Sequence, residues 1–118
     1  MDTKTFWGRL SIAMTERGHA PTQAAVGNLL SLKQSSIHKW EYGGLPRMRH
    51  SVQLAEKLGV TVEWLLTGRG VKRPLNEHET VLIELYRQLG DELERGEVFG
   101  RIREMLRRRP TDPNRPYV

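Results

Sequence analysis

The segment from residue 33 to residue 39 carries polar side chains that can donate hydrogen bonds, and it contains no carboxylate. Its polar residues are Lys33, Gln34, Ser35, Ser36, His38 and Lys39. Most of these side chains can donate hydrogen bonds to base edges or to phosphate oxygens. Gln is suited to adenine, and Lys to the O6 or N7 atom of guanine. These residue types therefore indicate a surface that contacts nucleic acid.

The side chains that most often perform catalysis or bind metals are scattered along the chain. The histidines are His19, His38, His50 and His78, with no HxxxH or HExxH spacing. The chain has no Gly-rich phosphate loop and no arrangement of Ser, His and Asp that spacing could bring together. It also has no Cys, which excludes disulfides, thiolate zinc sites and thiol nucleophiles. We therefore expect no enzyme activity, no metal site and no cofactor.

The polar segment lies within an apolar pattern that describes two short helices meeting at a turn. The inward positions of this pattern are Val26, Leu29, Leu30, Leu32, Ile37 and Trp40. Thr22 can cap the first helix through its hydroxyl, and the small Gly27 lets the second helix approach closely. This spacing is typical of a helix-turn-helix motif. Any two amphipathic helices of a small bundle are the alternative that the pattern alone leaves open.

Apolar periodicity and capping residues predict three further helices around the motif. They are expected at residues 3–17, 48–58 and 62–66. Thr61 is expected to cap the last of these, in which Trp64 and Leu65 are core residues. Either Gly43 or Gly44 is expected to end the second motif helix in the left-handed conformation. Residues 1–70 are therefore predicted to form a five-helix, all-α domain, followed by a linker at residues 71–75.

Specific sequence features extend the likeness beyond the motif. They are Gln23 at the start of the first motif helix, SxIxKWE from Ser35 to Glu41, Gly43-Gly44 followed by Pro46, and LAEKLGVTVEWLLTGRG from Leu54 to Gly70. With these features the chain resembles the Xre family of lambda-repressor-like helix-turn-helix regulators over residues 4–70. The resemblance implies that the second motif helix enters the major groove of DNA with its N-terminal residues at base edges.

The resemblance also assigns roles to individual residues. Those expected to read bases are Gln34, Ser35, His38 and Lys39. Those expected to contact phosphates are Gln23, Lys33, Arg47 and Arg49. Many relatives pair the Glu at position 41 with an Arg of the first helix, and both Arg9 and Arg17 are candidates for that role. Ser31 departs from the pattern, because the family usually has Gly in the motif turn.

Residues 76–107 are predicted to form a helical hairpin. Asn76 and Glu79 resemble a capping box for its first helix, which Gly90 is expected to end, and Asp91 can cap the second. The apolar residues expected at a dimer interface are Leu82, Leu85, Tyr86, Leu89, Ile102 and Leu106. Two helices cannot bury two apolar stripes alone. We therefore expect the hairpin to oligomerise with a second copy, with packing on its own first domain as the alternative.

Charge distinguishes the two halves of this 118-residue chain, whose net charge is +5. Residues 22–49 carry four basic side chains against one acid, a net of +3. Residues 74–106 carry four arginines against eight acids, a net of −4. The basic half suits phosphates, and the acidic half is expected to face away from DNA. Residues 108–118, with three prolines, are expected to be a disordered basic tail.

Together these features predict a transcriptional regulator, expected to be a repressor, that binds an inverted repeat in double-stranded DNA as a homodimer or higher oligomer. An antitoxin-like module, whose C-terminal helices bind a partner protein while DNA binding provides autoregulation, is the alternative. A DNA-compacting protein without sequence preference is a third possibility. No run of about 20 apolar residues and no secretory pattern is present, so we expect a cytoplasmic protein without a membrane partner. The roughly 48 residues after the first domain leave no room for an effector domain, so no small-molecule ligand is expected.

Overall fold

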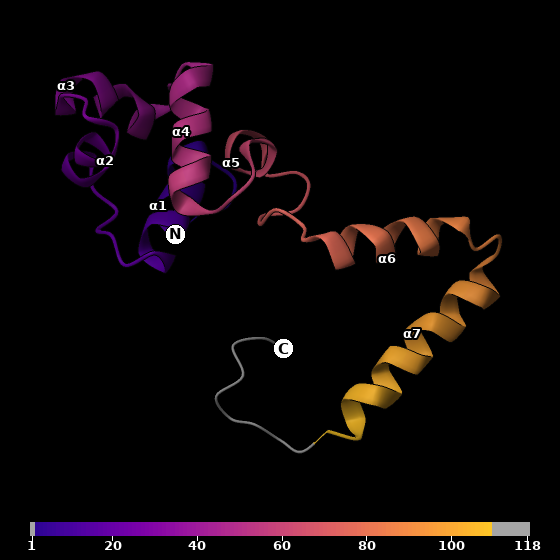
Figure 1. Cartoon of the computed structure of the whole chain (residues 1–118). Coiled ribbons are helices and arrows are strands. Elements are labelled where there is room, and N and C mark those ends of the chain that lie inside the picture. The colour runs from indigo at the N-terminus through magenta and orange to yellow at the C-terminus, as the bar shows by residue number, and fades with distance from the viewer. Residues whose placement is uncertain (1, 110–118) are drawn as a thin grey trace. The chain divides into compact units, whose positions relative to one another are not determined.

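The computed structural model describes residues 2–109, which form helices and turns without a strand (Figure 1). The all-α class is confirmed for these residues. The chain divides between residues 75 and 76 into two units. The first unit contains α1 (Phe6–Glu16), α2 (Gln23–Leu30), α3 (Gln34–Ile37), the 3-10 helix η1 (His38–Tyr42), α4 (Met48–Leu58) and α5 (Val62–Thr67). The second contains α6 (Glu77–Gln88) and α7 (Glu92–Arg107).

Helix α1 begins three residues later than the sequence predicted. Thr5 has an extended backbone, with φ −115° and ψ 155°, and its hydroxyl accepts a hydrogen bond from the Gly8 N–H. Ser, Thr, Asp and Asn side chains accept hydrogen bonds from the free N–H groups at helix starts. Thr5 is therefore the N-cap, and the helix begins at Phe6. The expected start near Thr3 was therefore wrong, whereas the end at Glu16, followed by Gly18 at φ +81°, agrees with the prediction.

The core of the first unit lies between α1 and the other helices. Helix α1 packs against α5 and η1, and α2 packs against α3 and α4. The largest fully buried apolar side chains are Leu10, Met14, Val26, Ile37, Leu54, Leu58 and Leu65. At the edge of this core the Phe6 and Trp40 rings meet edge to face, with centroids 6.3 Å apart. Because these side chains come from α1 to α5, the core holds the predicted motif helices in a fixed position.

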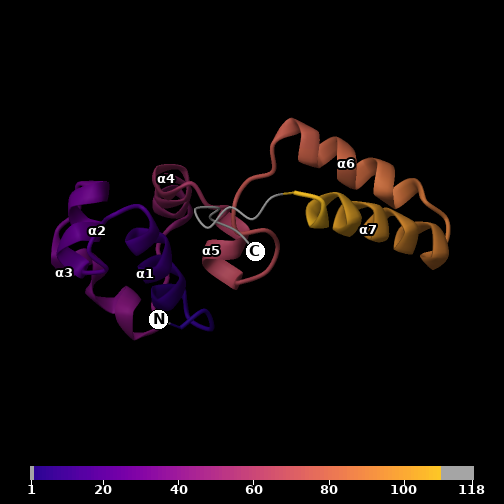
Figure 2. The same ribbon diagram turned by 90° about the horizontal axis from the view of Figure 1, so that it is seen from below.

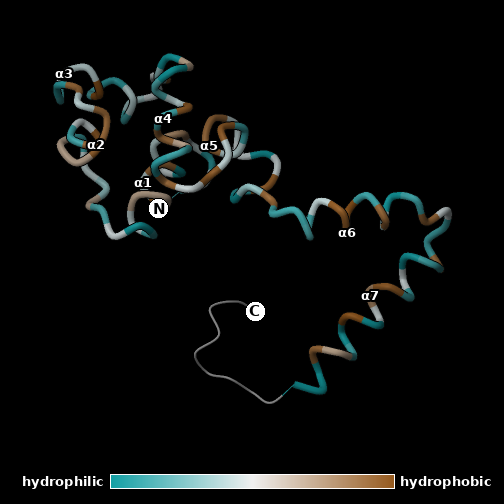
Figure 3. The backbone as a smooth tube through the Cα atoms, in the orientation of Figure 1, coloured by the Kyte–Doolittle hydropathy of each residue, from teal (hydrophilic) through white to brown (hydrophobic). Residues whose placement is uncertain are grey.

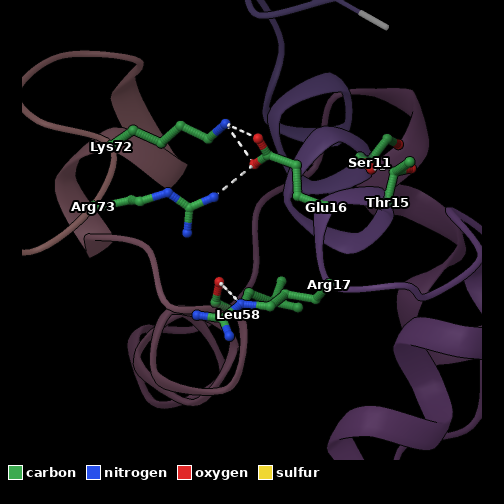
Figure 4. A network of polar contacts seen from close by, with 7 residues as sticks. All are labelled: Ser11, Thr15, Glu16, Arg17, Leu58, Lys72 and Arg73. Atoms are coloured by element: carbon green, nitrogen blue, oxygen red, sulfur yellow. Dashed lines mark hydrogen bonds and ion pairs between the residues drawn. The ribbon is translucent and has the colours of Figure 1, made fainter. Parts of the chain in front are cut away.

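Arg9 of α1 and Arg17, which directly follows α1, reach the C-terminal ends of other helices. Arg9 donates hydrogen bonds to the carbonyl oxygens of Leu65 and Leu66 at the end of α5. Arg17 donates one to the carbonyl oxygen of Leu58 at the end of α4 (Figure 4). The last carbonyls of a helix lack partners within it and carry partial negative charge. Both arginines therefore act as caps across the fold.

The segment after α5 folds back onto α1 and the start of α5. The Thr61 hydroxyl donates a hydrogen bond to the Val71 carbonyl oxygen at 2.6 Å, and the Lys72 carbonyl accepts one from the Thr61 N–H at 2.9 Å. The Lys72 and Arg73 side chains both form ion pairs with Glu16 (Figure 4). Residues 71–73 of the expected linker are therefore held against α1 and α5.

The second unit contains two capped helices with no buried residue in either. The Asn76 and Glu79 capping box is present, and the Asp91 carboxylate accepts a hydrogen bond from the Glu94 N–H. Both were predicted from the sequence. Gly90 does not end α6: the helix stops at Gln88, and Leu89 leaves in an extended conformation with φ −68° and ψ 128°.

Residues 89–91 connect α6 to α7 (Figures 1 and 2). The Tyr86 and Phe99 rings lie 5.6 Å apart, and the Arg95 guanidinium lies over the Tyr86 ring. Apolar positions recur along both helices (Figure 3). No helix between residues 2 and 109 is long and apolar enough to cross a membrane. Most of the basic tail expected at residues 108–118 lies outside the described residues, which end at 109.

Candidate nucleic-acid interface

Helix starts position the residues that were predicted to meet DNA. Gln23 is the first residue of α2, capped by the Thr22 hydroxyl, which accepts a hydrogen bond from the Ala25 N–H. Gln34 and Ser35 open α3, and His38 opens η1. Gln23, Gln34, Ser35 and His38 together line one shallow surface hollow. Four predicted contact residues from three elements are thus brought to one place.

The segment that follows the motif turn is not one continuous α-helix. Helix α3 makes a single turn to Ile37, and the chain then tightens into the 3-10 helix η1. Ile37, the last residue of α3, and Trp40, three residues later in η1, both point inward, at 0% and 3% exposure. Their predicted core role is confirmed. His38 and Lys39, which lie between them in the sequence, remain exposed.

The motif turn depends on a left-handed residue, Ser31, and on a close approach to the helical residue Gly27. Ser31 adopts the left-handed conformation, with φ 57° and ψ 42°, where the family pattern has Gly. A Cβ atom on Gly27 would lie 2.7 Å from the Leu32 carbonyl oxygen and 3.3 Å from Ile37 Cδ1. The predicted close approach at Gly27 is therefore confirmed. The atom nearest to such a Cβ belongs to the backbone of the turn, and the Ile37 side chain is the next nearest group.

A chain of hydrogen bonds connects the amides in the hollow. Gln34 Nε2 donates to Gln23 Oε1 at 3.4 Å, and Gln23 Nε2 donates to Glu41 Oε1 at 3.1 Å. His38 Nδ1 lies 3.5 Å from the same Gln23 nitrogen, and the His38 ring packs on Tyr42 with centroids 5.0 Å apart. The two glutamine amides are thereby connected to an acid at the edge of the hollow.

The pair that many relatives form between the Glu at position 41 and an arginine of the first helix is absent from residues 2–109. Arg9 is buried and donates to backbone carbonyls of Thr3, Leu65 and Leu66. Arg17 likewise donates to a backbone carbonyl. Burial lowers the pKa of the Arg9 guanidinium, and the nearby Asp2 carboxylate opposes that shift. Glu41 instead accepts from Gln23, a partner that the sequence analysis missed because 18 residues separate the two.

The cations predicted to contact phosphates lie at or near the starts of α3 and α4. Lys33 is the N-cap residue of α3, Arg47 that of α4, and Arg49 lies in the first turn of α4. These three residues and Lys39 are exposed, and none has an ion-pair partner within residues 2–109. A second hollow, lined in part by Ser35, His38, Lys39 and Arg47, extends the surface toward α4. Unpaired cations are therefore available beside the amide side chains.

The residues predicted at a dimer interface lie in the second unit. Leu82, Leu85, Ile102 and Leu106 are 52%, 57%, 40% and 43% exposed. Tyr86 and Leu89 are half-buried, and Tyr86 contacts Phe99 within the unit. Within the second unit, α6 and α7 therefore do not cover this apolar surface themselves.

The described residues contain no group of three or more His, Asp or Glu side chains placed to hold a metal ion. No protein-family model, no curated protein and no solved structure matches the chain. The surface of α2, α3 and η1 is therefore the feature of the described residues that indicates function.

Proposed function

We propose that this protein is a sequence-specific DNA-binding regulator, with α3 and the start of η1 in the major groove. The observation that carries the proposal is the hollow in which Gln23, Gln34, Ser35 and His38 meet. Four exposed cations lie on the same motif and on the following loop and helix, and two of them, Lys39 and Arg47, line the second hollow, which shares Ser35 and His38 with the first. Base-reading amides surrounded by phosphate-binding cations are the arrangement that direct readout requires.

Each group has a role that follows from its chemistry. A Gln34 amide donates to N7 and accepts from the N6 amino group of adenine, and the Lys39 ammonium donates to guanine O6 or N7. Ser35 and His38 are proposed to contact neighbouring base edges. Gln23, at the start of α2, is proposed to contact a phosphate where the helix dipole favours an anion. Lys33, Arg47 and Arg49 are proposed to contact flanking phosphates.

We further propose that the active species is a homodimer joined by α6 and α7. These helices carry the exposed apolar side chains that a second copy would cover. A symmetric dimer presents two recognition segments about 34 Å apart, so the operator is an inverted repeat. Occupying such a site within a promoter would repress transcription.

Selection of bound sequences from a random duplex library at near-physiological salt tests the proposal. The expected result is an inverted repeat in which Gln34→Ala weakens the preference at one base pair by about 1–3 kcal/mol. Gln53→Ala is the matched control, since Gln53 is an exposed amide on α4 outside the hollow. Failure to enrich any sequence would overturn the proposal.

The exposed apolar faces of α6 and α7 favour a second candidate. In this alternative they bind a different protein, as in antitoxins, and DNA binding serves autoregulation. The two candidates differ in whether loss of the apolar face also removes DNA affinity.

A further inference from the structure

Glu41 is an acid within a motif that is otherwise basic. Its side chain is exposed, and it lies in the same 3-10 helix as His38 and Lys39. A carboxylate near DNA phosphates weakens binding by charge repulsion. The two arginines in or directly after α1 that could neutralise it are both bound to backbone carbonyls elsewhere. Its partner is Gln23 Nε2, at 3.1 Å.

A glutamine amide has a donor on one side and an acceptor on the other. An ionised carboxylate can only accept, so Glu41 holds the nitrogen of the Gln23 amide toward itself. The Gln23 oxygen is then free to accept a hydrogen bond from Gln34 Nε2, and the two atoms lie 3.4 Å apart. His38 Nδ1 faces the same Gln23 nitrogen, but an imidazole nitrogen changes between acceptor and donor with its tautomer. Among these three neighbours only Glu41 enforces one orientation.

We propose that Glu41 is the positioning residue that sets the hydrogen-bond polarity of Gln23 and Gln34, and through them the base that Gln34 prefers. This inference rests on the proposed function, because it concerns which base is read. Because the Gln34 amide nitrogen is held on the side of Gln23, the positions of its remaining N–H donor and of its oxygen acceptor along the base edge are fixed. Adenine offers N7 as acceptor and N6 as donor, so one order matches it and the reverse order sets donor against donor.

The test compares variants at positions 41 and 23 on duplexes that differ only at the base pair read by Gln34. Glu41→Lys replaces an acceptor with a donor, which turns the Gln23 amide and reverses the order at Gln34. The preference for adenine is expected to fall by about five- to 150-fold, the range that one bidentate pair supplies. Glu41→Gln keeps one oxygen acceptor of the same reach but adds an amide donor, so it is expected to retain part of the preference and to lose less of it than Glu41→Lys.

A double variant separates polarity from other effects of the substitution. In Gln23→Glu with Glu41→Lys, both oxygens at position 23 accept, so one can pair with the new lysine and the other with Gln34 Nε2. This variant is expected to restore the preference for adenine. Asn28→Lys controls for added positive charge, since Asn28 is exposed on α2 and lines neither hollow. It is expected to raise affinity for all duplexes alike.

The outcomes separate this inference from the proposed function. A wild-type preference that disappears in Gln34→Ala but persists in Glu41→Lys would overturn the inference alone. The inference would also be overturned if Glu41→Lys loses the preference for adenine and the double variant does not recover it. The same holds if Glu41→Gln loses as much of this preference as Glu41→Lys does. A wild-type protein with no base preference would overturn both proposals. Glu41→Ala, which removes the acceptor without adding charge, is expected to give an intermediate preference and replaces Glu41→Lys if that variant does not fold.

Discussion

At the scale of single residues, the candidate interface contains two kinds of side chain. Gln23 and Gln34 are connected to each other by a hydrogen bond, so their amides are oriented before any ligand arrives. Lys33, Lys39 and Arg47 are exposed and have no ion-pair partner within residues 2–109. Ordered amides suit base discrimination, and free cations suit contact with phosphates, which position the protein but carry no sequence information.

The phosphate role predicts a change in salt dependence. Lys33→Ala and Arg47→Ala should each lower the slope of log affinity against log salt by about 0.9, because each removes one neutralised phosphate. Affinity should fall similarly for all sequences, as measured by titration of labelled duplex at several salt concentrations. Lys57→Ala, at the other end of α4 from Arg47, should leave the slope unchanged. An unchanged slope in both Lys33 and Arg47 variants would contradict these assignments.

At the scale of elements, α1 stabilises the first unit through polar as well as apolar contacts. Arg9 and Arg17 hold the C-terminal carbonyls of α5 and α4, and Glu16 pairs with the segment after α5. Contacts of this kind fix the ends of short helices, which are unstable alone. The motif helices depend in turn on this scaffold, since α1 also packs against η1.

Loss of the Arg9 side chain is predicted to destabilise the first unit. Arg9→Ala leaves the Leu65 and Leu66 carbonyls without their donor in a buried setting, at a cost of about 3 kcal/mol in the free energy of unfolding. Arg17→Ala removes one hydrogen bond to Leu58 and should cost about 1 kcal/mol. Urea denaturation followed by Trp fluorescence measures both. Equal stability of Arg9→Ala and wild type would show that these hydrogen bonds contribute nothing.

The close approach at Gly27 gives a second prediction at this scale. In a free helix Gly→Ala would stabilise by about 1 kcal/mol. Here the added Cβ lies 2.7 Å from the Leu32 carbonyl oxygen, so the turn must move, and Gly27→Ala should lower stability by about 1–3 kcal/mol. The exposed neighbour Asn28→Ala is the control, expected to be neutral or slightly stabilising. A higher melting temperature for Gly27→Ala in thermal unfolding would contradict the argument.

At the scale of the whole molecule, the two units differ in how they bury apolar surface. The first has a core drawn from α1 to α5, whereas α6 and α7 contain no buried residue. Leu82, Leu85 and Ile102 are each 40% exposed or more. Exposed apolar surface of this kind favours association with a second protein surface. The excess of acids in residues 74–106 favours a position away from DNA.

A charge on the apolar face distinguishes the two candidate functions. Leu85→Glu should abolish dimers in sedimentation experiments, and DNA affinity should fall with them because two half-sites are no longer bound together. Glu84→Gln, on the same exposed helix, should change neither property. Monomeric Leu85→Glu protein with unchanged DNA affinity, or wild-type protein that is already monomeric, would favour the module that binds a different partner.

Local signals in the sequence predicted the elements well. The Thr22 and Thr61 caps, the Asn76 capping box and the bounds of α4 all agree with the structure. The core positions of Ile37 and Trp40 also follow from apolar spacing. Caps and periodicity act between residues within one or two turns, so the sequence order alone contains them. Two helix ends that differ from the prediction also have local causes. Thr5 caps α1, so the helix begins at Phe6, and the extended Leu89 ends α6 at Gln88, before Gly90.

Which partner each polar side chain takes was decided only by tertiary structure. Arg9 reaches carbonyls 56 and 57 residues away, Arg17 one 41 residues away, and Glu41 takes Gln23 in place of an arginine. The sequence determined the helices and the residue types that they expose. The pairing of those residues required the packing of α1 against α5 and η1, because the distance between side chains distant in sequence depends on the arrangement of the helices that carry them.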